Sequence, residues 1–279
     1  MKLYKCEVDI KSTFLTYPKG DMLFGFLFYW NEKLKKGFEL IKDNKSKIVF
    51  SDFLPKNHLP KPSLPINYFV ENEEELELKR KVIKSISWIK EDKLKEGDLS
   101  LDEDDKIEFI KTFNSVKNHL NKLTFTTDEG FTPFSIREIE FLYPVEIYIA
   151  SDIDIDKVVN FINEIGEIGF GRKSSIGKGR FEIVKKKEVK LNKGASYVAL
   201  SPFITKKRSF YNTFSRFGKY HYNKKPFKKP VVLMDRGTVV FEECGLVEGE
   251  IIDNSLVKES ILNAYSIMIP LNIRKKDEN

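Results

Sequence analysis

The chain has 279 residues, enough for one large or two modest domains, a formal net charge of +6, and a hydrophobic fraction of 41% that can bury a substantial core. Its two cysteines, Cys6 and Cys244, exclude a disulfide framework and a zinc site made of cysteine alone. The longest apolar run, Met22–Trp30, is far shorter than the ~20 residues of a membrane span, and the alternating start of the chain is unlike a signal peptide. We therefore expect a cytoplasmic protein.

The first half of the chain predicts a strand, a helix and a second strand. The alternating pattern of residues 2–10 is typical of a half-buried strand. Asp21 is a plausible N-cap for an apolar helix over 21–34, and a short strand follows at 48–50. The proline-rich segment 53–65 is too dense in proline for a helix or a strand ladder.

The middle of the chain differs in composition from its surroundings. Residues 71–110 carry fourteen acidic and eight basic side chains, and we expect them to be mostly helical or loop. A hairpin with a glycine-containing turn is predicted from Phe125 to Phe134.

The second half predicts a further strand, helix and strand at 145–150, 156–165 and 181–187, and then shorter strands at 196–200, 230–234, 237–241, 246–252 and 265–272. Together with the first half, the order becomes β-α-β-β-α-β, which is the ferredoxin-like or RRM-like order. The prediction is an α+β protein with a ferredoxin-like domain at 1–188, interrupted by an insertion at about 53–143. A second, smaller domain, ferredoxin-like or β-rich, is expected at 189–279.

A glycine-rich basic loop follows the predicted helix at 156–165. From Gly166 to Arg180 it holds five glycines, four cations and two serines, and one acid, Glu167. Glycines let backbone N–H groups approach phosphate oxygens. The spacing fits neither the Walker pattern nor the dinucleotide pattern, which also requires a helix after the loop. We expect contacts to a longer nucleic-acid backbone from Gly169, Gly171, Arg172, Lys173, Ser174, Ser175, Gly177, Lys178, Gly179 and Arg180. A flexible surface connector remains the alternative.

The charge is concentrated around this loop. Residues 168–234 hold eighteen Lys and Arg but two acids, a net charge of +16, which leaves −10 for the remainder. Aromatic residues alternate with the cations of this segment: Phe203, Phe210, Tyr211, Phe214, Phe217, Tyr220, Tyr222 and Phe227. Aromatic faces stack on unpaired bases while cations follow the backbone. The segment predicts a surface for a polyanion, although we expect more than half of these rings to lie in the core.

Four motifs in order resemble the RAMP superfamily of CRISPR-associated proteins. They are Asp21-Met-Leu-Phe24-Gly25, where the family usually has Ser-Asp-Thr-Leu-Phe-Gly; the proline run Phe53 through Pro62; Val116 through Thr124, where the family tends to show Asn-His-Ile-Asp-Arg-Leu-Thr; and the glycine loop. Gly20, Met22 and Arg172 depart from the family pattern. Within the superfamily, the chain is most similar to the subunit that caps the 5′ end of the guide RNA in type III-A (Csm) effector complexes.

The resemblance implies a non-catalytic subunit without a cofactor that binds the repeat-derived 5′ tag of crRNA. It also implies two protein partners, the large polymerase-like subunit and the first repeated backbone subunit. A hairpin thumb from the insertion would press between nucleotides, and here that role falls to Thr124–Phe134. Beyond the glycine loop, the implied RNA contacts are Lys19, Asn118, His119, Asn121, Lys122, Thr124 and Phe125.

Two other functions remain open from the sequence. A metal-independent RAMP endoribonuclease that processes repeat RNA would use His119 as general acid or base. A single-strand RNA-binding protein outside CRISPR would bind tagged and untagged RNA equally. The triplet Asp152, Asp154 and Asp156 lacks the glycine and glutamate of a calcium loop, so it predicts a strand exit and a helix N-cap instead.

Overall fold

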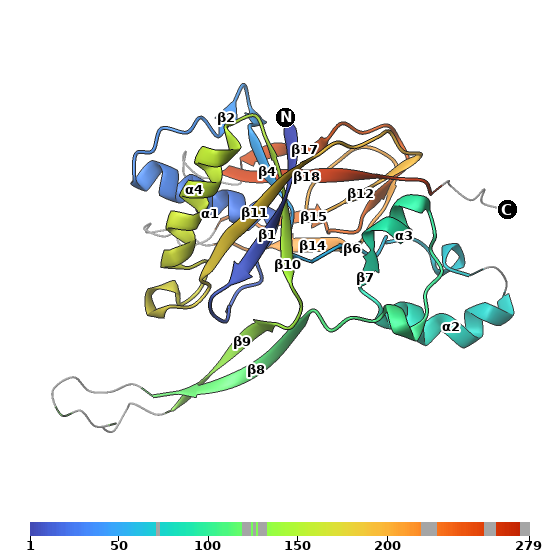
Figure 1. The fold of residues 1–279 in the computed structure, drawn as a ribbon, viewed down its shortest axis with the longest axis horizontal. Coiled ribbons are helices and arrows are strands. Elements are labelled where there is room, and N and C mark those ends of the chain that lie inside the picture. Colours follow the sequence, from blue (N-terminus) through green and yellow to red (C-terminus); the bar gives the residue numbers. More distant parts are fainter. Residues whose placement is uncertain are drawn as a thin grey trace.

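The computed structural model describes residues 1–70, 73–118, 124, 127, 133–218, 228–253 and 261–273. It is a mixed structure of helices and strands, and the strand pairs in this part of the chain are antiparallel. Figure 1 shows a body with two helices on its left, a helical lobe on its right and a long two-stranded arm that projects from below. Within the described residues, we find no helix with the length and apolarity that a membrane crossing requires.

The first sheet contains the predicted strands of both halves of the chain. Its strands are β1 (Lys2–Ile10), β4 (Ile48–Phe50), β5 (Leu54–Pro55), β10 (Val145–Ser151) and β11 (Phe181–Val189). The order across the sheet is β11-β1-β10-β4, and β5 also pairs with β10. Strands from before and after the long insertion therefore lie side by side in one sheet.

Two helices, α1 (Gly20–Lys33) and α4 (Ile155–Ile168), pack against this sheet (Figure 1). In α4, Val158, Phe161, Ile162 and Ile165 are all buried. Their spacing of three and four residues places them on one face of the helix, which covers the sheet. Both helices are confirmed, each within a few residues of the predicted bounds, but the prediction of Asp21 as N-cap is wrong: Lys19 is the N-cap of α1 and Asp21 lies in its first turn.

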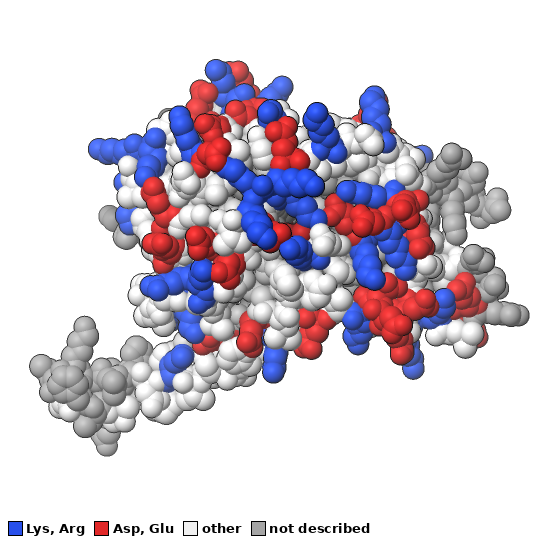
Figure 2. Space-filling model, in the orientation of Figure 1, with Lys and Arg blue, Asp and Glu red and all other residues white. Residues whose placement is uncertain are grey.

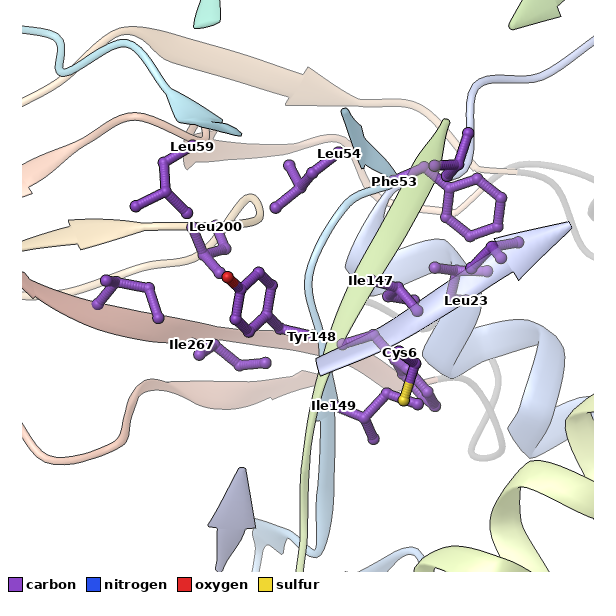
Figure 3. Close-up of a cluster of buried hydrophobic side chains, with 14 of the residues drawn as sticks. Cys6, Leu23, Phe53, Leu54, Leu59, Ile147, Tyr148, Ile149, Leu200 and Ile267 are labelled. Atoms are coloured by element: carbon purple, nitrogen blue, oxygen red, sulfur yellow. The ribbon is translucent and has the colours of Figure 1, made fainter. Parts of the chain in front are cut away.

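The second sheet lies on the other side of β10. Its strands are β12 (Ser196–Ala199), β13 (Ser209–Phe210), β16 (Val239–Val240), β17 (Val247–Asp253) and β18 (Ile261–Leu271), in the order β13-β16-β12-β18-β17. Successive side chains of a strand point to opposite faces. In Figure 3, Ile147 and Ile149 lie on the side of Cys6, whereas Tyr148 points toward Leu200. All seven residues of β10 are buried, so this strand is at the centre of a core that both sheets share.

Three two-stranded sheets complete the body. They are β2 (Ile41–Lys42) with β3 (Lys45–Ser46), β6 (His58–Pro60) with β7 (Trp88–Lys90), and β14 (Thr213–Arg216) with β15 (Val231–Met234). The strands β5 and β6 correct the prediction that 53–65 forms no ladder. Each is only two or three residues long, and each ends on a proline, where a missing N–H is tolerated.

The acidic part of the insertion forms the helical lobe. Its elements are η1 (Ile66–Tyr68), α2 (Glu73–Ser85), α3 (Glu91–Glu96) and η2 (Glu103–Asp105). An ion pair attaches it to the first sheet, because Lys5 Nζ of β1 lies 2.6 Å from Glu91 Oε2 of α3. Lys5 Nζ also lies 3.1 Å from Glu146 Oε1 of β10 within the sheet. The prediction of helix and loop over 71–110 is confirmed, except for β7.

The arm is a two-stranded ribbon of β8 (Ile110–Lys117) and β9 (Phe134–Phe141). It joins the body through a bridge between Phe14 and Ile139, whose backbone groups exchange hydrogen bonds of 2.9 and 2.7 Å. The predicted hairpin at Phe125–Phe134 lies almost wholly outside the described residues. The strands that lead to it were not predicted, because the more buried face of the ribbon carries polar and charged residues such as Ser115 and Glu138, so the sequence lacks a regular apolar alternation.

Candidate nucleic-acid interface

Three segments that are distant in the sequence meet at the end of the body from which the arm projects. They are the glycine loop between α4 and β11, the connection between β1 and α1, and the base of the arm. Backbone N–H groups of the loop donate to the β1–α1 connection, from Gly179 to Thr13 O at 2.9 Å and from Arg180 to Ser12 Oγ at 2.8 Å. The motifs that the sequence singled out are therefore neighbours in space.

Two glycines of the loop are required by its fold. Gly179 has a φ of +74°, and a Cβ there would lie 2.1 Å from Phe170 O. Gly169 has a φ of +101°, and its Cβ would lie 2.2 Å from Lys178 O. Such φ values and contacts are available to glycine alone. Both glycines are buried where the two ends of the loop cross. They therefore have a structural role in the loop. The RNA contact predicted for them stays a prediction.

The middle of the loop presents cations and a hydroxyl to solvent. Arg172, Lys173, Ser175 and Arg180 are exposed, whereas Ser174 and Gly177 are half-buried. Lysine and arginine side chains are visible at the left of Figure 2, over the loop that follows α4 in Figure 1. Among the described residues, no carboxylate lies within ion-pair distance of Arg172, Lys173 or Arg180. These charges are available to a polyanion.

Lys178, the fourth cation of the loop, is engaged inside the protein. Its Nζ lies 2.5 Å from Glu138 Oε2 of β9 and donates to Thr13 Oγ1 at 2.8 Å. Ser115 of β8 also donates to Glu138. Burial alone would raise the pKa of Glu138, but the hydrogen bonds from Lys178, Ser115 and Thr13 lower it to about 2. The ion pair fixes the arm to the glycine loop, and a role for Lys178 in RNA binding stays a prediction.

The arm continues the surface of the loop. Lys173 Nζ lies 5.9 Å from the centre of the Phe134 ring at the start of β9, within the range of a cation–π contact. Asn118, at the end of β8, is exposed, as is Thr124. The other predicted contacts of the arm, His119, Asn121, Lys122 and Phe125, lie outside the described residues.

Lys19, predicted to contact RNA, lies in a group of ion pairs beneath the start of α1. Its Nζ lies 2.7 Å from Asp235 Oδ1 and 3.9 Å from the centre of the Phe214 ring. The neighbouring Asp52 accepts from Gly20 N–H at 2.9 Å and from Arg236 Nη1 at 2.8 Å. We call Lys19, Asp52, Asp235 and Arg236 the junction cluster, because it joins α1, the segment after β4 and the second sheet.

Sequence reasoning did not find the junction cluster or Glu138. Asp52 and Arg236 are separated by 184 residues, and each is an isolated charge in its own segment. Gly20 gives a partial signal, since the resembling family usually has serine there. A Cβ at Gly20 would lie 2.1 Å from Phe50 O and 2.8 Å from Ser201 Cβ, so the close packing of α1 on β4 and the second sheet explains this departure.

The aromatic residues of the basic segment 168–234 are less buried than expected. Among the five rings that the structure describes, Phe203 is fully buried, Phe210 and Phe214 are half-buried, and Tyr211 and Phe217 are exposed. Tyr220, Tyr222 and Phe227 lie outside the described residues.

Two aspartates of the triplet and the buried His58 have structural roles. Asp154 caps α4, since its side chain accepts from Asp156 N–H at 2.9 Å. Asp152 pairs with the terminal amine at 2.7 Å. His58 is buried, with Nδ1 2.8 Å from Lys56 O. Within the described residues, no three His, Cys, Asp or Glu side chains are grouped as metal ligands.

Solved structures match the fold over its whole length, although no protein-family model and no curated protein matches the sequence. A chain of a Csm1–Csm4 cassette in complex with AMPPNP has a TM-score of 0.61 and 14% identity, covering 99% of this chain and 100% of that one. A chain of a Csm3–Csm4 subcomplex from a type III-A CRISPR-Cas interference complex has a TM-score of 0.57 and 18% identity, covering 98% of this chain and 100% of that one. A chain of a type III-B Cmr-beta complex bound to cognate target RNA and AMPPnP has a TM-score of 0.50 and 16% identity, covering 86% of each chain.

These matches show a shared fold, which occurs in the Csm1–Csm4 cassette, in the Csm3–Csm4 subcomplex of a type III-A CRISPR-Cas interference complex and in the type III-B Cmr-beta complex. The fold of this chain is the fold of Csm4, the component that the first two assemblies share. At 14–18% identity, the likeness is one of fold.

Proposed function

We propose that this protein is a non-catalytic, RNA-binding subunit of a type III-A CRISPR effector complex. It binds the repeat-derived 5′ tag of crRNA and joins the large subunit to the repeated backbone subunit in antiviral defence. The observation that carries the proposal is the meeting of the glycine loop, with its exposed Arg172, Lys173 and Arg180, and the arm on a fold shared with Csm4. No cofactor is part of the proposal, and its setting is the cytoplasm.

The RNA backbone would pass over the exposed face of the glycine loop. Arg172, Lys173 and Arg180 supply charge there, and Ser175 supplies a hydroxyl donor. Lys173 lies beside Phe134 at the far end of the described ribbon, and the arm is fixed by Lys178 and Glu138, which suits a thumb that holds its position against RNA. The thumb assignment to Thr124–Phe134 is part of the proposal.

The partners follow from the same likeness. The solved neighbours pair Csm4 with Csm1 in one assembly and with Csm3 in another. By analogy, this chain would contact the large subunit on one side and the backbone subunit on the other. Neighbours that are named as parts of assemblies favour a subunit over the isolated endoribonuclease that His119 suggested.

The proposed domain division also rests on the fold. The sheet order β11-β1-β10-β4 with two helices against it supports a ferredoxin-like domain at 1–188, with the lobe and arm as its insertion. The second sheet would form the smaller domain at 189–279. The shared core around Tyr148 and Ile267 implies that the two would unfold together.

Isolation of the protein from its native host by an affinity label tests the proposed function. We expect it to carry two partner subunits and RNA molecules with one common 5′ end. RNA with scattered 5′ ends would indicate a general single-strand binder, and a protein without RNA or partners would contradict the proposal.

Incubation of labelled guide RNA with the purified protein tests the absence of catalysis. We expect the RNA to stay intact. Cleavage that His119→Ala abolishes would support the endoribonuclease instead.

A further inference from the structure

A pocket lies beside the glycine loop, on the exposed side of α1. It has a volume of 600 Å³, within the usual range for small-ligand sites. One wall is α1, with Gly25 and Tyr29; the second is the glycine loop, with Gly171 and Ser174; the third includes Phe217 after β14. The pocket and the proposed RNA path therefore share the residues of the loop.

Gly25 leaves the α1 wall of this pocket open. It lies in the middle of the helix and is exposed, and a Cβ built on it meets no atom within 4 Å. Glycine in a helix interior weakens the helix. At Gly20 the packing of the protein explains the glycine, because a Cβ would overlap Phe50 O. At Gly25 the described residues supply no such reason, and the space it leaves belongs to the pocket.

The side chains around this space are aromatic and cationic. Tyr29 and Trp30 are half-buried on α1, and Phe217 is 76% exposed on the opposite wall. Lys33 Nζ lies 4.5 Å from the centre of the Trp30 ring. Flat rings bind the face of an unpaired base, and nearby cations attract the phosphate attached to it.

The end of the pocket nearest the start of α1 carries buried polar atoms. Asp21 is 5% exposed, and its Oδ1 pairs with Arg216 at 2.5 Å. In the described part of the chain, Asp21 Oδ2 and Arg216 Nε have no hydrogen-bond partner. Leaving buried polar atoms without partners is unfavourable. Both atoms are shielded from solvent, so this ion pair forms part of the pocket wall and does not contact an occupant through them.

We propose that this pocket holds one unstacked nucleobase of the single-stranded RNA whose backbone crosses the glycine loop. The inference rests on the proposed function and assigns α1 a direct part in RNA recognition. Gly25 provides the room for the base, and Tyr29, Trp30 and Phe217 provide the flat surfaces.

The variant Gly25→Leu fills the pocket without removing a charge. Because leucine favours helix, its unfolding free energy should equal or exceed that of the wild type. Its affinity for the guide RNA that co-purifies with the protein should fall about tenfold, as expected for loss of one stacked base. The salt dependence should stay unchanged, since no phosphate contact is removed. Asn160→Leu, at an exposed position of α4, is the matched control and should bind RNA as the wild type does.

The same RNA, synthesised with one abasic nucleotide at a time in its 5′ portion, identifies the base. At one position, loss of the base should weaken binding to the wild type but have no further effect on Gly25→Leu. The proposal is overturned if Gly25→Leu binds the RNA as tightly as the wild type does. It is also overturned if every abasic nucleotide weakens RNA binding by Gly25→Leu as much as it weakens binding by the wild type. It is also overturned if Gly25→Leu blocks assembly with a partner protein without RNA, because the occupant is then a protein segment. Failure of the proposed function is distinct, since the wild type would then carry no guide RNA.

Discussion

The glycine loop and the junction cluster lie on the same body, and both are rich in cations, but their charges are satisfied differently. In the junction cluster, Arg236 and Lys19 pair with Asp52 and Asp235 beneath α1. In the glycine loop, the side chains of Arg172, Lys173 and Arg180 are exposed, without a carboxylate nearby among the described residues. The first arrangement joins parts of the fold, and the second leaves charge for a ligand. Cations on the same body therefore do not have one role.

Lys178 combines features of the glycine loop and of the junction cluster. It belongs to the loop by sequence, but it pairs with Glu138 as the cations of the junction cluster pair with their carboxylates. We expect substitutions in the paired group to affect the unfolding free energy and substitutions in the exposed group to affect RNA binding.

The largest effect should follow from removing the carboxylate of the junction cluster. Asp52 is fully buried, and Arg236 is stacked over the rings of Tyr17 and Trp88 at 4.9 and 4.8 Å. Asp52→Ala leaves Arg236 without its ion-pair partner in this site, and such losses cost about 3–5 kcal/mol. Urea denaturation at pH 7 measures the change.

Asp235→Ala is the control for this prediction. The Asp235 side chain is 29% exposed, and Asp52 remains for both cations after its removal. We expect a loss below about 1 kcal/mol, as for exposed ion pairs. Equal losses in the two variants would show that the buried carboxylate has no special role.

The next effect concerns the pH dependence of stability at the base of the arm. The pKa of Glu138 is lowered from 4.5 to about 2 in the folded protein. A carboxyl with a lowered folded pKa stabilises the protein above its unfolded pKa, and this contribution is lost as the pH falls from about 4.5 to about 2. At 1.36 kcal/mol for each pH unit, the contribution is about 3 kcal/mol. In Glu138→Gln, the fall in unfolding free energy over this pH range should be smaller by that amount.

Glu140→Gln tests whether the effect belongs to Glu138. Glu140 lies on the same strand but is exposed, so its variant should follow the wild-type curve between pH 4.5 and pH 2. If the two variants give parallel curves, the pairing of Glu138 with Lys178 does not stabilise the fold.

The sequence predicted the parts of the fold whose residues share a buried face. Strand β1 and helix α4 have regular apolar spacing, and both were placed within a few residues. The strands β8 and β9 were missed, because the ribbon they form is largely exposed and its only fully buried side chain in the described part is the charged Glu138. Periodicity reports burial, so it fails where an element is held by an ion pair.

The candidate site was predicted in outline from the glycines and cations of one loop. The φ values of Gly169 and Gly179 show why those glycines are needed, but sequence alone suggested a contact to phosphate. The different roles of Lys178 and Arg172 could not be predicted, because the partner of Lys178 lies 40 residues away in an insertion. Only the folded arrangement distinguishes a paired cation from an exposed one.

The salt dependence of RNA binding tests the central claim most directly. The triple variant of Arg172, Lys173 and Arg180 to Ala is compared with a triple variant of Lys185, Lys187 and Lys190 to Ala, three exposed lysines on and after β11. Each lost phosphate contact removes ~0.7 from the log–log slope, so the loop variant should lose about 2 and the control much less. Both should keep the unfolding free energy of the wild type within about 0.5 kcal/mol, as surface changes do. Equal slopes for the wild type and the loop variant would contradict the assignment of the glycine loop as the RNA-binding surface.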